Sequence, residues 1–491
     1  IFLSTSLRMN LPQTFHAQMQ LLLGDEECHA LLEALNEEPS VSVRLNCRKA
    51  VDWQLPIESP VPWCEQGYYL TERPAFTFDP LFHAGTYYVQ EASSMFLWHT
   101  MKILQTNVLK NSPLLALDLC AAPGGKTTLL ADALPDDSLL VANEIVKQRA
   151  QVLRENVVKW GSPNVVVTNS DSSAFASMGE VFDLVVCDAP CSGEGMFRKD
   201  ERAVEEWSPQ NVELCWRRQR EIVANVWACL KPGGVFIYST CTFNIKENEQ
   251  NVSWMMEELQ AEPLDCHPDA SWGIHAAIAP DLGGVSFPCY RFMPHCTRGE
   301  GLFMVALRKP NTDIWSSGMT GERPLGGGMD VKKETATKGK RKDVKVPADV
   351  SAWLADASDL FFDFDEKRQK YVAFPLKHIA LLQRLRQYVH VIHAGIDVAE
   401  QKGNAHKGFK LQPCHSLAMC TRYSRGAFTE CELDKAKALS YLRAESIVLP
   451  AGTPHGYVLL TYQHVPLGVA NNLGTRANNL YPQEWRILSK S

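Results

Sequence analysis

Between Leu114 and Ser239 the chain alternates short apolar runs with amphipathic segments of helical length. This alternation constrains the fold more than any other feature of the sequence. The apolar runs are residues 114–120, 139–143, 165–168, 184–187 and 235–239. Helical periodicity fills the intervals, for example at 148–159 and 212–230. Strands that alternate with helices form a mostly parallel sheet covered by helices on both faces. We therefore predict an α/β domain at the centre of the chain.

The segments on either side of this domain have different patterns. With 491 residues the chain has room for about three domains. We predict a small α+β N-terminal domain at 1–105, the α/β domain at 106–310, a basic flexible linker at 311–346 and a C-terminal region at 347–491. Within the last, residues 456–480 alternate β-like runs with glycine and asparagine turns, which is typical of a small β-barrel. Met9, followed by a helix-capping Asn10, is expected to be the start of translation.

Composition excludes several classes of protein. The chain is 45% hydrophobic and 21% charged, which is typical of globular proteins, and no apolar stretch approaches the roughly 20 residues of a membrane span. The 15 cysteines are odd in number and none lie in a Cys-x-x-Cys pair, so a disulfide framework and a zinc ribbon are disfavoured. We predict reduced thiols, a cytoplasmic location, a monomer and no metal site.

The net charge of -7 does not exclude a nucleic-acid partner, because binding depends on where charge clusters. Lys and Arg outnumber acids at 332–345 and at 367–410, and we predict RNA contact for both segments. Solubility alone is the other interpretation.

The stretch from Cys120 to Thr128, Cys-Ala-Ala-Pro-Gly-Gly-Lys-Thr-Thr, joins a predicted strand to a predicted helix. A phosphate-binding P-loop requires a glycine five residues before Gly125, and that position is Cys120. The dinucleotide pattern Gly-x-Gly-x-x-Gly is absent as well. We therefore predict a loop that a ligand approaches closely at Gly124 and Gly125, without a cradle for phosphates.

Acidic residues end the next two strands. Glu144 lies about 20 residues beyond the glycines, where such folds bind ribose hydroxyls, and Asp171 follows the third strand, where it is positioned for an adenine base. A single glycine turn followed by these acids favours adenosine without a phosphate chain, namely S-adenosylmethionine. Either acid alone is more often an ordinary polar residue at a strand end.

Two further strands end in cysteine motifs, Asp188-Ala-Pro-Cys191-Ser-Gly and Ser239-Thr-Cys241-Thr. Ligands of open parallel sheets bind beyond the carboxyl ends of the strands, so Asp188, Cys191 and Cys241 are expected to converge on the cofactor. A thiol beside a methyl donor suits methylation of a pyrimidine at C5. Thiolate addition at C6 makes C5 nucleophilic, and a carboxylic acid can stabilise the charge that develops on the ring.

Taken together, these motifs resemble the RNA cytosine-5 methyltransferases of the Sun/nucleolar-protein family. The similarity runs from about Val41 to Lys309 and includes Tyr88-Val-Gln-Glu-Ala-Ser-Ser94 and Gly195-Met-Phe-Arg-Lys-Asp200. It implies a Rossmann-like core with a mostly parallel seven-stranded sheet. It also implies that Cys241 is the nucleophile, that Cys191 assists product release and that Asp188 contacts the base near the cofactor. The resemblance assigns cofactor binding to Asp188 and to Cys120, Ala121, Ala122, Pro123, Gly124, Gly125, Lys126, Glu144 and Asp171.

Within this family the chain is most similar to the bacterial small-subunit rRNA methyltransferase F subgroup. Val61-Pro-Trp-Cys-Glu-Gln-Gly67 and a C-terminal extension like the PUA RNA-binding domain of that subgroup carry the similarity. The expected substrate is small-subunit rRNA or a partly assembled subunit, not DNA or a membrane. DNA-type chemistry, with Cys191 as nucleophile, a tRNA substrate and a non-catalytic assembly factor are the alternatives.

Four more residues are candidates for holding the RNA. Base methylation requires an unpaired or flipped cytosine, and basic side chains would then bind the backbone. Arg198 and Lys199 follow the Asp188 motif and are predicted to lie near the crevice. Arg44 and Asn46 are predicted either to hold the N-terminal domain or to touch RNA. His83 and His99 are expected to be structural.

Overall fold

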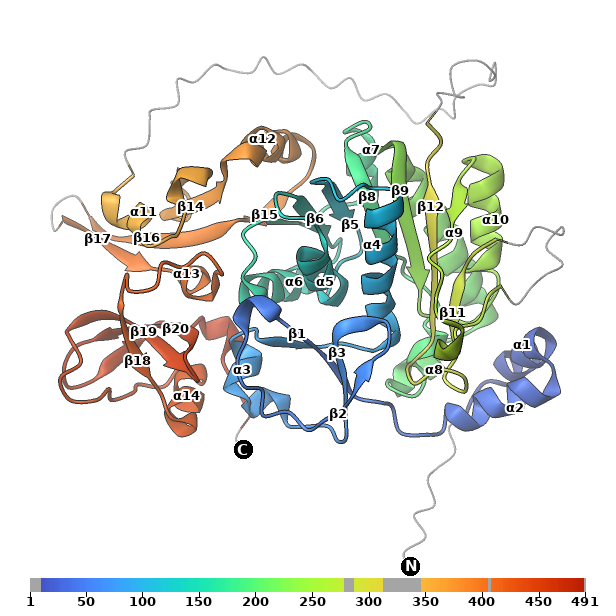
Figure 1. Ribbon diagram of the computed structural model, residues 1–491, viewed down its shortest axis with the longest axis horizontal. Coiled ribbons are helices and arrows are strands. Elements are labelled where there is room, and N and C mark those ends of the chain that lie inside the picture. The colour runs from blue at the N-terminus through green and yellow to red at the C-terminus, as the bar shows by residue number, and fades with distance from the viewer. Residues whose placement is uncertain (1–9, 278–286, 312–345, 405–407, 490–491) are drawn as a thin grey trace, which may run out of the picture.

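The computed structural model describes residues 10–277, 287–311, 346–404 and 408–489. The presumed start and the basic stretch 332–345 lie outside these ranges. In Figure 1 a central sheet carries the N-terminal part of the chain below it and the C-terminal part beside it. Among the described residues, no helix combines the length and the apolar character needed to span a bilayer.

The central sheet confirms the predicted Rossmann-like core. Seven of its strands lie in the order β10 (Glu262–Leu264), β12 (Leu302–Arg308), β9 (Leu230–Thr240), β8 (Phe182–Asp188), β5 (Leu115–Asp118), β6 (Leu139–Asn143) and β7 (Val165–Thr168). The strands from β9 to β7 are parallel, and β12 runs antiparallel to β9. The five predicted strands are therefore present and adjacent.

Alternate strand residues pack into two different cores, which explains why the strands read as continuous apolar runs. One core includes residues of the helices α4 (Phe96–Asn107), α5 (Gly125–Ala133) and α6 (Lys147–Trp160). The opposite core includes residues of α7 (Ser172–Ala176), α9 (Pro209–Trp227), α10 (Glu249–Glu258) and α12 (Ile379–Tyr388). Helices thus cover both faces of the sheet, as predicted (Figure 1).

Two details differ from the sequence predictions. In the described part of the chain the sheet has nine strands, because β11 (Tyr290–Phe292) pairs with β12 and β15 (Val391–Ala394) pairs antiparallel with β7. An edge strand is thereby supplied by the C-terminal region. In addition, Lys231-Pro-Gly-Gly234, which separates the predicted helix at 212–230 from the predicted strand at 235–239, lies inside β9. The pairing of β9 with β8 is interrupted between Leu230 and Val235. Pro232, which has no backbone N–H to donate, lies in this unpaired stretch.

The N-terminal part begins with a pair of helices and continues with a small sheet and a short third helix. The helices are α1 (Gln13–Leu23) and α2 (Asp25–Ala34). The sheet has the order β2 (Ile57–Val61), β3 (Cys64–Leu70), β1 (Ser42–Leu45) and β4 (Tyr87–Val89), and α3 (Pro80–His83) precedes β4. The helices pack on the segment that follows the Asp188 motif, where α8 (Glu201–Glu206) lies, through Phe15 against Phe197 and Trp207.

The C-terminal part has two four-stranded sheets. The first is β13 (Leu360–Asp365), β14 (Lys370–Pro375), β16 (Ile396–Asn404) and β17 (Gly408–Pro413). The second is β18 (Thr429–Glu432), β19 (Gly456–Tyr462), β20 (Val465–Asn472) and β21 (Ala477–Asn479), which contains the predicted 456–480 strands. Besides α12, its described helices include α11 (Ala348–Ala352), α13 (His415–Met419) and α14 (Lys435–Leu442). Val43 and Tyr87 of the N-terminal sheet share a core with Tyr441 and Leu460, so both ends of the chain pack together.

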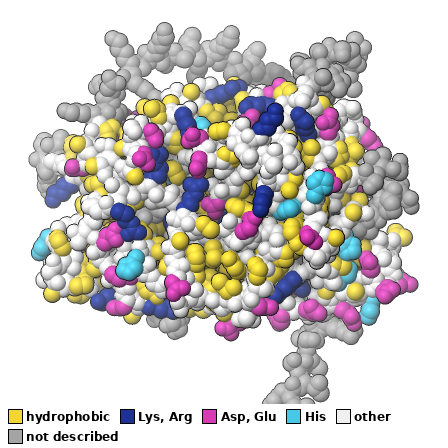
Figure 2. All heavy atoms as spheres, viewed as in Figure 1, with side chains coloured by type: hydrophobic (Ala, Val, Ile, Leu, Met, Phe, Trp, Pro, Cys, Tyr) yellow, Lys and Arg dark blue, Asp and Glu magenta, His cyan; other side chains and the backbone are white. Residues whose placement is uncertain are grey.

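Several Lys and Arg side chains of the basic segment 367–410 form ion pairs with acidic residues. Arg368 and Lys370 pair with Asp397. Lys377 pairs with Asp137, which lies in the loop between α5 (Gly125–Ala133) and β6. Figure 2 shows Lys and Arg interspersed with acids over the face in view. Of these cations, Lys377 therefore links the C-terminal part to the central domain, and RNA contact by the segment stays a prediction.

Arg44 and Asn46 hold the N-terminal sheet to the core, the first of the two roles predicted for them. The Arg44 guanidinium is buried and donates to Gln90 Oε1 at 2.8 Å, Thr128 Oγ1 at 2.6 Å and Asp132 Oδ2 at 3.1 Å. Asn46 Nδ2 donates to the carbonyl oxygens of Gly85 at 2.9 Å and Trp160 at 3.1 Å.

Replacing Arg44 should therefore destabilise the fold. We expect Arg44→Met to lower the free energy of unfolding by about 3–5 kcal/mol, because Asp132 loses its fully buried partner. The control is Arg48→Met, since Arg48 also faces Asp132 but is 41% exposed and 3.9 Å away. Its loss should cost about 1 kcal/mol or less. Equal shifts in urea unfolding for the two variants would contradict this account.

Candidate active site

The loop from Cys120 to Gly124 joins the end of β5 to the start of α5. Gly124 precedes the helix with φ 117°, a left-handed conformation that favours glycine. Thr127 Oγ1 donates to Asp118 Oδ2 at 2.6 Å, which fixes the first turn of α5 to the strand. Asp118 is fully buried, and this burial raises its pKa to about 7. The contact between Thr127 and Asp118 thus anchors the loop to the sheet, and Cys120–Pro123 line a cavity where they can contact a ligand.

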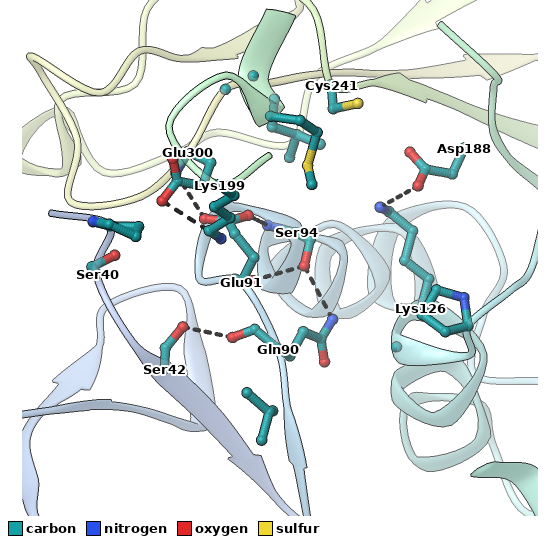
Figure 3. Close-up of a pocket in the computed structure, with 18 of the residues that line it drawn as sticks. Ser40, Ser42, Gln90, Glu91, Ser94, Lys126, Asp188, Lys199, Cys241 and Glu300 are labelled. Carbon is teal, nitrogen blue, oxygen red and sulfur yellow. Dashed lines mark hydrogen bonds and ion pairs between the residues drawn. The ribbon is translucent and has the colours of Figure 1, made fainter. Parts of the chain in front are cut away.

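A cavity of about 770 Å³ opens above this loop. Figure 3 shows Lys126 and Asp188 on one side of it, Lys199 and Glu300 on the other, and Cys241 above. The lining comes from the 120–126 segment, the ends of β8 and β9, the N-terminal sheet and the loop before β12. Its members include Ser40, Ser42, Gln90, Glu91, Ser94, Cys120, Ala121, Ala122, Pro123, Gly125, Lys126, Asp188, Lys199, Cys241 and Glu300.

Lys126 and Asp188 form an ion pair at one side of the cavity (Figure 3). Lys126 Nζ lies 2.8 Å from Asp188 Oδ2, and Ser239 Oγ donates to Asp188 Oδ1 at 2.7 Å. Burial works to lower the pKa of Lys126, but the adjacent Asp188 carboxylate outweighs it and raises that pKa above its ordinary value. The lysine is therefore charged at neutral pH, and the carboxylate is held in one orientation beside the cavity.

The two motif cysteines are in contact. Their Sγ atoms lie 3.1 Å apart, and the backbone N–H of Cys241 donates to Cys191 Sγ at 3.3 Å. Cys241 lines the cavity, whereas Cys191 lies outside its lining. The hydrogen bond with Cys241, together with burial, raises the pKa of Cys191 well above its ordinary value. Of the two, only Cys241 therefore presents its side chain to a ligand in the cavity, and Cys191 is held as a thiol behind it.

Glu144 and Asp171 lie at the ends of β6 and β7, as predicted, but outside the cavity lining. Glu144 is buried, accepts from the backbone N–H of Val146 at 2.9 Å and pairs with Arg149 at 3.3 Å. Asp171 is exposed and caps α7 through Ser173. The structure thus gives both acids local partners, and their contact with a cofactor stays a prediction.

The two cations predicted near the crevice, Arg198 and Lys199, differ in how far their side chains are exposed. Lys199 lines the cavity, and its side chain lies 3.5 Å from Glu300 Oε1. Arg198 was also expected to face RNA, but its guanidinium is only 5% exposed and donates to Glu300 Oε2 at 2.5 Å and to the carbonyl oxygens of Gly299 and Ala34. Arg198 therefore lines the cavity, as predicted, but Glu300 binds its guanidinium internally, and contact of this side chain with RNA stays a prediction.

The sequence predictions missed the wall formed by Ser40, Ser42, Gln90, Ser94 and Glu300. No strand-end pattern marks these residues. The signal nearest to them is the Tyr88–Ser94 run, which contains Gln90, Glu91 and Ser94 and was noted only as a family similarity. Glu91 accepts from the backbone N–H of Ser93, Ser94 and Glu300, so this run also fixes the loop before β12.

Comparison with known proteins gives matches along most of the chain. Residues 11–92 match the N-terminal domain of 16S rRNA methyltransferase RsmF, 107–308 match the 16S rRNA methyltransferase RsmB/F model, and 428–487 match the methyltransferase RsmF PUA domain. The ribosomal RNA small subunit methyltransferase F of Erwinia tasmaniensis is 30% identical over 98% of each chain. The protein of the same name from Vibrio cholerae is 30% identical over 97% of this chain and 98% of its own.

Solved structures support the fold. A methyltransferase homolog from Pyrococcus horikoshii is 26% identical with a TM-score of 0.51, covering 62% of this chain and 97% of its own. NSun6 from the same organism, solved with SFG, has a TM-score of 0.51 at 20% identity and covers 62% of this chain and 100% of its own. Both similarities span somewhat more than half of the present chain.

Proposed function

The chain belongs to the ribosomal RNA small subunit methyltransferase F family, and on that premise we propose that it methylates C5 of a cytosine in 16S rRNA, with S-adenosylmethionine as the methyl donor and Cys241 as the nucleophile. One observation carries the assignment of the nucleophile. Of the two cysteines in contact, Cys241 alone lines the cavity that also holds the Lys126–Asp188 pair and the 120–126 loop.

The 120–126 loop suits this cofactor. It offers small side chains and backbone at Cys120–Pro123 and lacks the glycine that a phosphate cradle requires. When bound, S-adenosylmethionine supplies an electrophilic methyl group. We propose that Cys120–Lys126 and Asp188 contact it, with Glu144 and Asp171 on its adenosine side.

The residues at the cavity then have distinct roles in the reaction. The Cys241 thiolate adds to C6 of the cytosine, and the electron pair of the C5–C6 double bond becomes available at C5 for the methyl group. Asp188, oriented by Ser239 and Lys126, accepts a hydrogen bond from the cytosine amino group, and in its protonated form it donates to N3, which stabilises the charge that develops on the ring. Loss of the C5 proton then re-forms the double bond, and the pair of the C6–S bond returns to Cys241, with Cys191 assisting this release.

The direct test is transfer of a labelled methyl group. Purified enzyme should label 16S rRNA at a cytosine, in free RNA or in 30S subunits, and the label should co-migrate with 5-methylcytidine after digestion. Labelling of tRNA alone would assign a different substrate. Cofactor binding without transfer to any RNA would leave a non-catalytic assembly factor. We also propose that the enzyme acts as a monomer in the cytoplasm.

The predicted ribose contact can be tested separately. Glu144→Ala should weaken S-adenosylmethionine binding by about 10- to 100-fold, the value of one or two hydrogen bonds to a charged acceptor. Titration calorimetry measures this without RNA. The control is Glu155→Ala, which removes a carboxylate from α6 that pairs with Lys159. Unchanged cofactor affinity in a folded Glu144→Ala protein would limit Glu144 to its contacts with Val146 and Arg149.

A further inference from the structure

Two loops carry the cysteine pair, and each contains one buried glutamate. The 189–195 loop follows β8 and holds Cys191 and Glu194. The 241–248 loop follows β9 and holds Cys241 and Glu247. Both glutamates are 0% exposed and lie outside the cavity lining, so neither contacts a ligand there. The reaction described above assigns them no role.

Each glutamate binds the backbone of the opposite loop. Glu194 Oε2 accepts from the backbone N–H of Phe243 at 2.7 Å and of Asn244 at 2.9 Å. In the reverse direction, Glu247 accepts from Ser192, from its backbone N–H at 3.0 Å and from its hydroxyl at 2.5 Å. Ser192 is adjacent to Cys191 in the chain, and Phe243 and Asn244 lie two and three residues beyond Cys241. The two carboxylates therefore tie the backbones that carry both thiols.

Further hydrogen bonds join the glutamates to each other and to the helices. Asn244 Nδ2 donates to Glu247 Oε2 at 2.6 Å and to Glu194 Oε1 at 3.2 Å. Gln219 of α9 donates to Glu247 at 2.8 Å, and the Trp207 indole donates to Glu194 at 3.0 Å. Every donor is neutral, and among the described residues no Lys or Arg forms an ion pair with either glutamate.

Burying two carboxylates without a cation costs free energy that a neutral side chain would avoid. Burial raises the pKa of Glu247, even though Ser192 and Asn244 stabilise the charged form by hydrogen bonding. A network of this cost is expected where geometry matters for function, and here it lies directly behind the reacting thiols.

We propose that Glu194 and Glu247 are positioning residues, which set the separation and orientation of Cys191 and Cys241 by cross-bonding the two loops. This inference rests on the proposed function and deepens it. The glutamates act through the loop backbones and contact neither RNA nor cofactor. A displacement of about 1 Å at a reacting group can cost about 100-fold in rate, so small shifts of either loop matter.

The test uses isosteric variants. We expect Glu247→Gln and Glu194→Gln to lower kcat by about 100-fold while the KM for RNA changes by less than about 3-fold, because binding does not depend on the thiols. The control is Glu213→Gln, which removes a partly exposed acid that contacts Lys246 of the same loop through its side chain only. It should retain wild-type kcat. If a glutamine variant fails to fold, Ser192→Ala removes one acceptor bond of Glu247 and should lower kcat by about 10-fold.

A second measurement needs no RNA. Diamide should convert the Cys191–Cys241 pair of the wild-type protein rapidly to a disulfide, since the sulfurs are 3.1 Å apart, and peptide mapping locates the product. Disulfide formation should be at least about 10-fold slower in the glutamine variants. An unchanged rate in those variants would overturn the positioning role. Slower formation in a chain that methylates no RNA would support the positioning role and refute the proposed function, so the two failures are distinguishable.

Discussion

Cys241→Ala is expected to abolish methylation of 16S rRNA, with a loss of at least about 10⁴-fold in single-turnover rate. Removal of a nucleophile commonly has an effect of this size. Alanine has no thiolate to add to C6, and cytosine C5 is too weak a nucleophile to take the methyl group without that addition. Cofactor affinity and the unfolding midpoint should stay close to wild type. Labelled methyl transfer and a denaturing gel for covalent RNA measure both consequences, and we expect neither product nor adduct.

The matched control is Cys215→Ala, because Cys215 is also a free cysteine, and it is buried on α9 outside the cavity lining. It should retain wild-type turnover. The contradicting result would be a covalent RNA adduct formed by the Cys241→Ala protein. Cys191 would then be the nucleophile, and the DNA-type mechanism would replace the one proposed.

The core and the convergence of the motifs could be predicted from the sequence, since both depend on local patterns and a general rule. Apolar runs between Leu114 and Ser239 defined the strands, and the carboxyl ends of parallel strands share one edge of a sheet. Asp188 and Cys241 follow adjacent strands, so their proximity required no knowledge of the structure. The 3.1 Å contact between the thiols, by contrast, depends on loop conformations that the motifs do not encode.

Contacts between distant segments were not predictable in this way. Arg198 looks like a surface cation in the sequence, but it is bound by Glu300, about 100 residues later in the chain. Strand β15 joins the sheet at β7 although more than 200 residues separate them in the chain. Neither the ion pair nor the strand pairing leaves a periodic pattern in the sequence, because each joins segments that lie far apart in the chain.

Glu194 and Glu247 show the same limit within the active site. In the sequence each is one acidic residue among 56 Asp and Glu, a few positions from a cysteine motif. Only the folded loops show that each carboxylate binds the backbone of the other loop. The chemistry of a site can thus be predicted from motifs, while the residues that hold its geometry emerge from the structure.

Cys191→Ala is expected to have the opposite signature to Cys241→Ala, namely accumulation of a covalent enzyme–RNA complex. Addition to C6 and methylation of C5 require Cys241 and should proceed. Of the steps that follow, in which a base takes the C5 proton and the C6–S bond breaks, we assign Cys191 to the second, where its thiol can donate a proton to the departing sulfur of Cys241. Cys191 is suited to this role because its Sγ lies 3.1 Å from that of Cys241 and its raised pKa keeps it protonated.

The complex should carry the labelled methyl group, resist denaturant and disappear after protease treatment, while turnover falls by about 10²–10⁴-fold, the range of general acid–base assistance. The double variant Cys191→Ala/Cys241→Ala should form no complex, which would place the bond on Cys241 and not on another of the free cysteines. If Cys191→Ala instead turned over at the wild-type rate without an adduct, release would not depend on the second thiol. The Lys126–Asp188 pair, which also lines the cavity, would then be the next group to test for removal of the C5 proton.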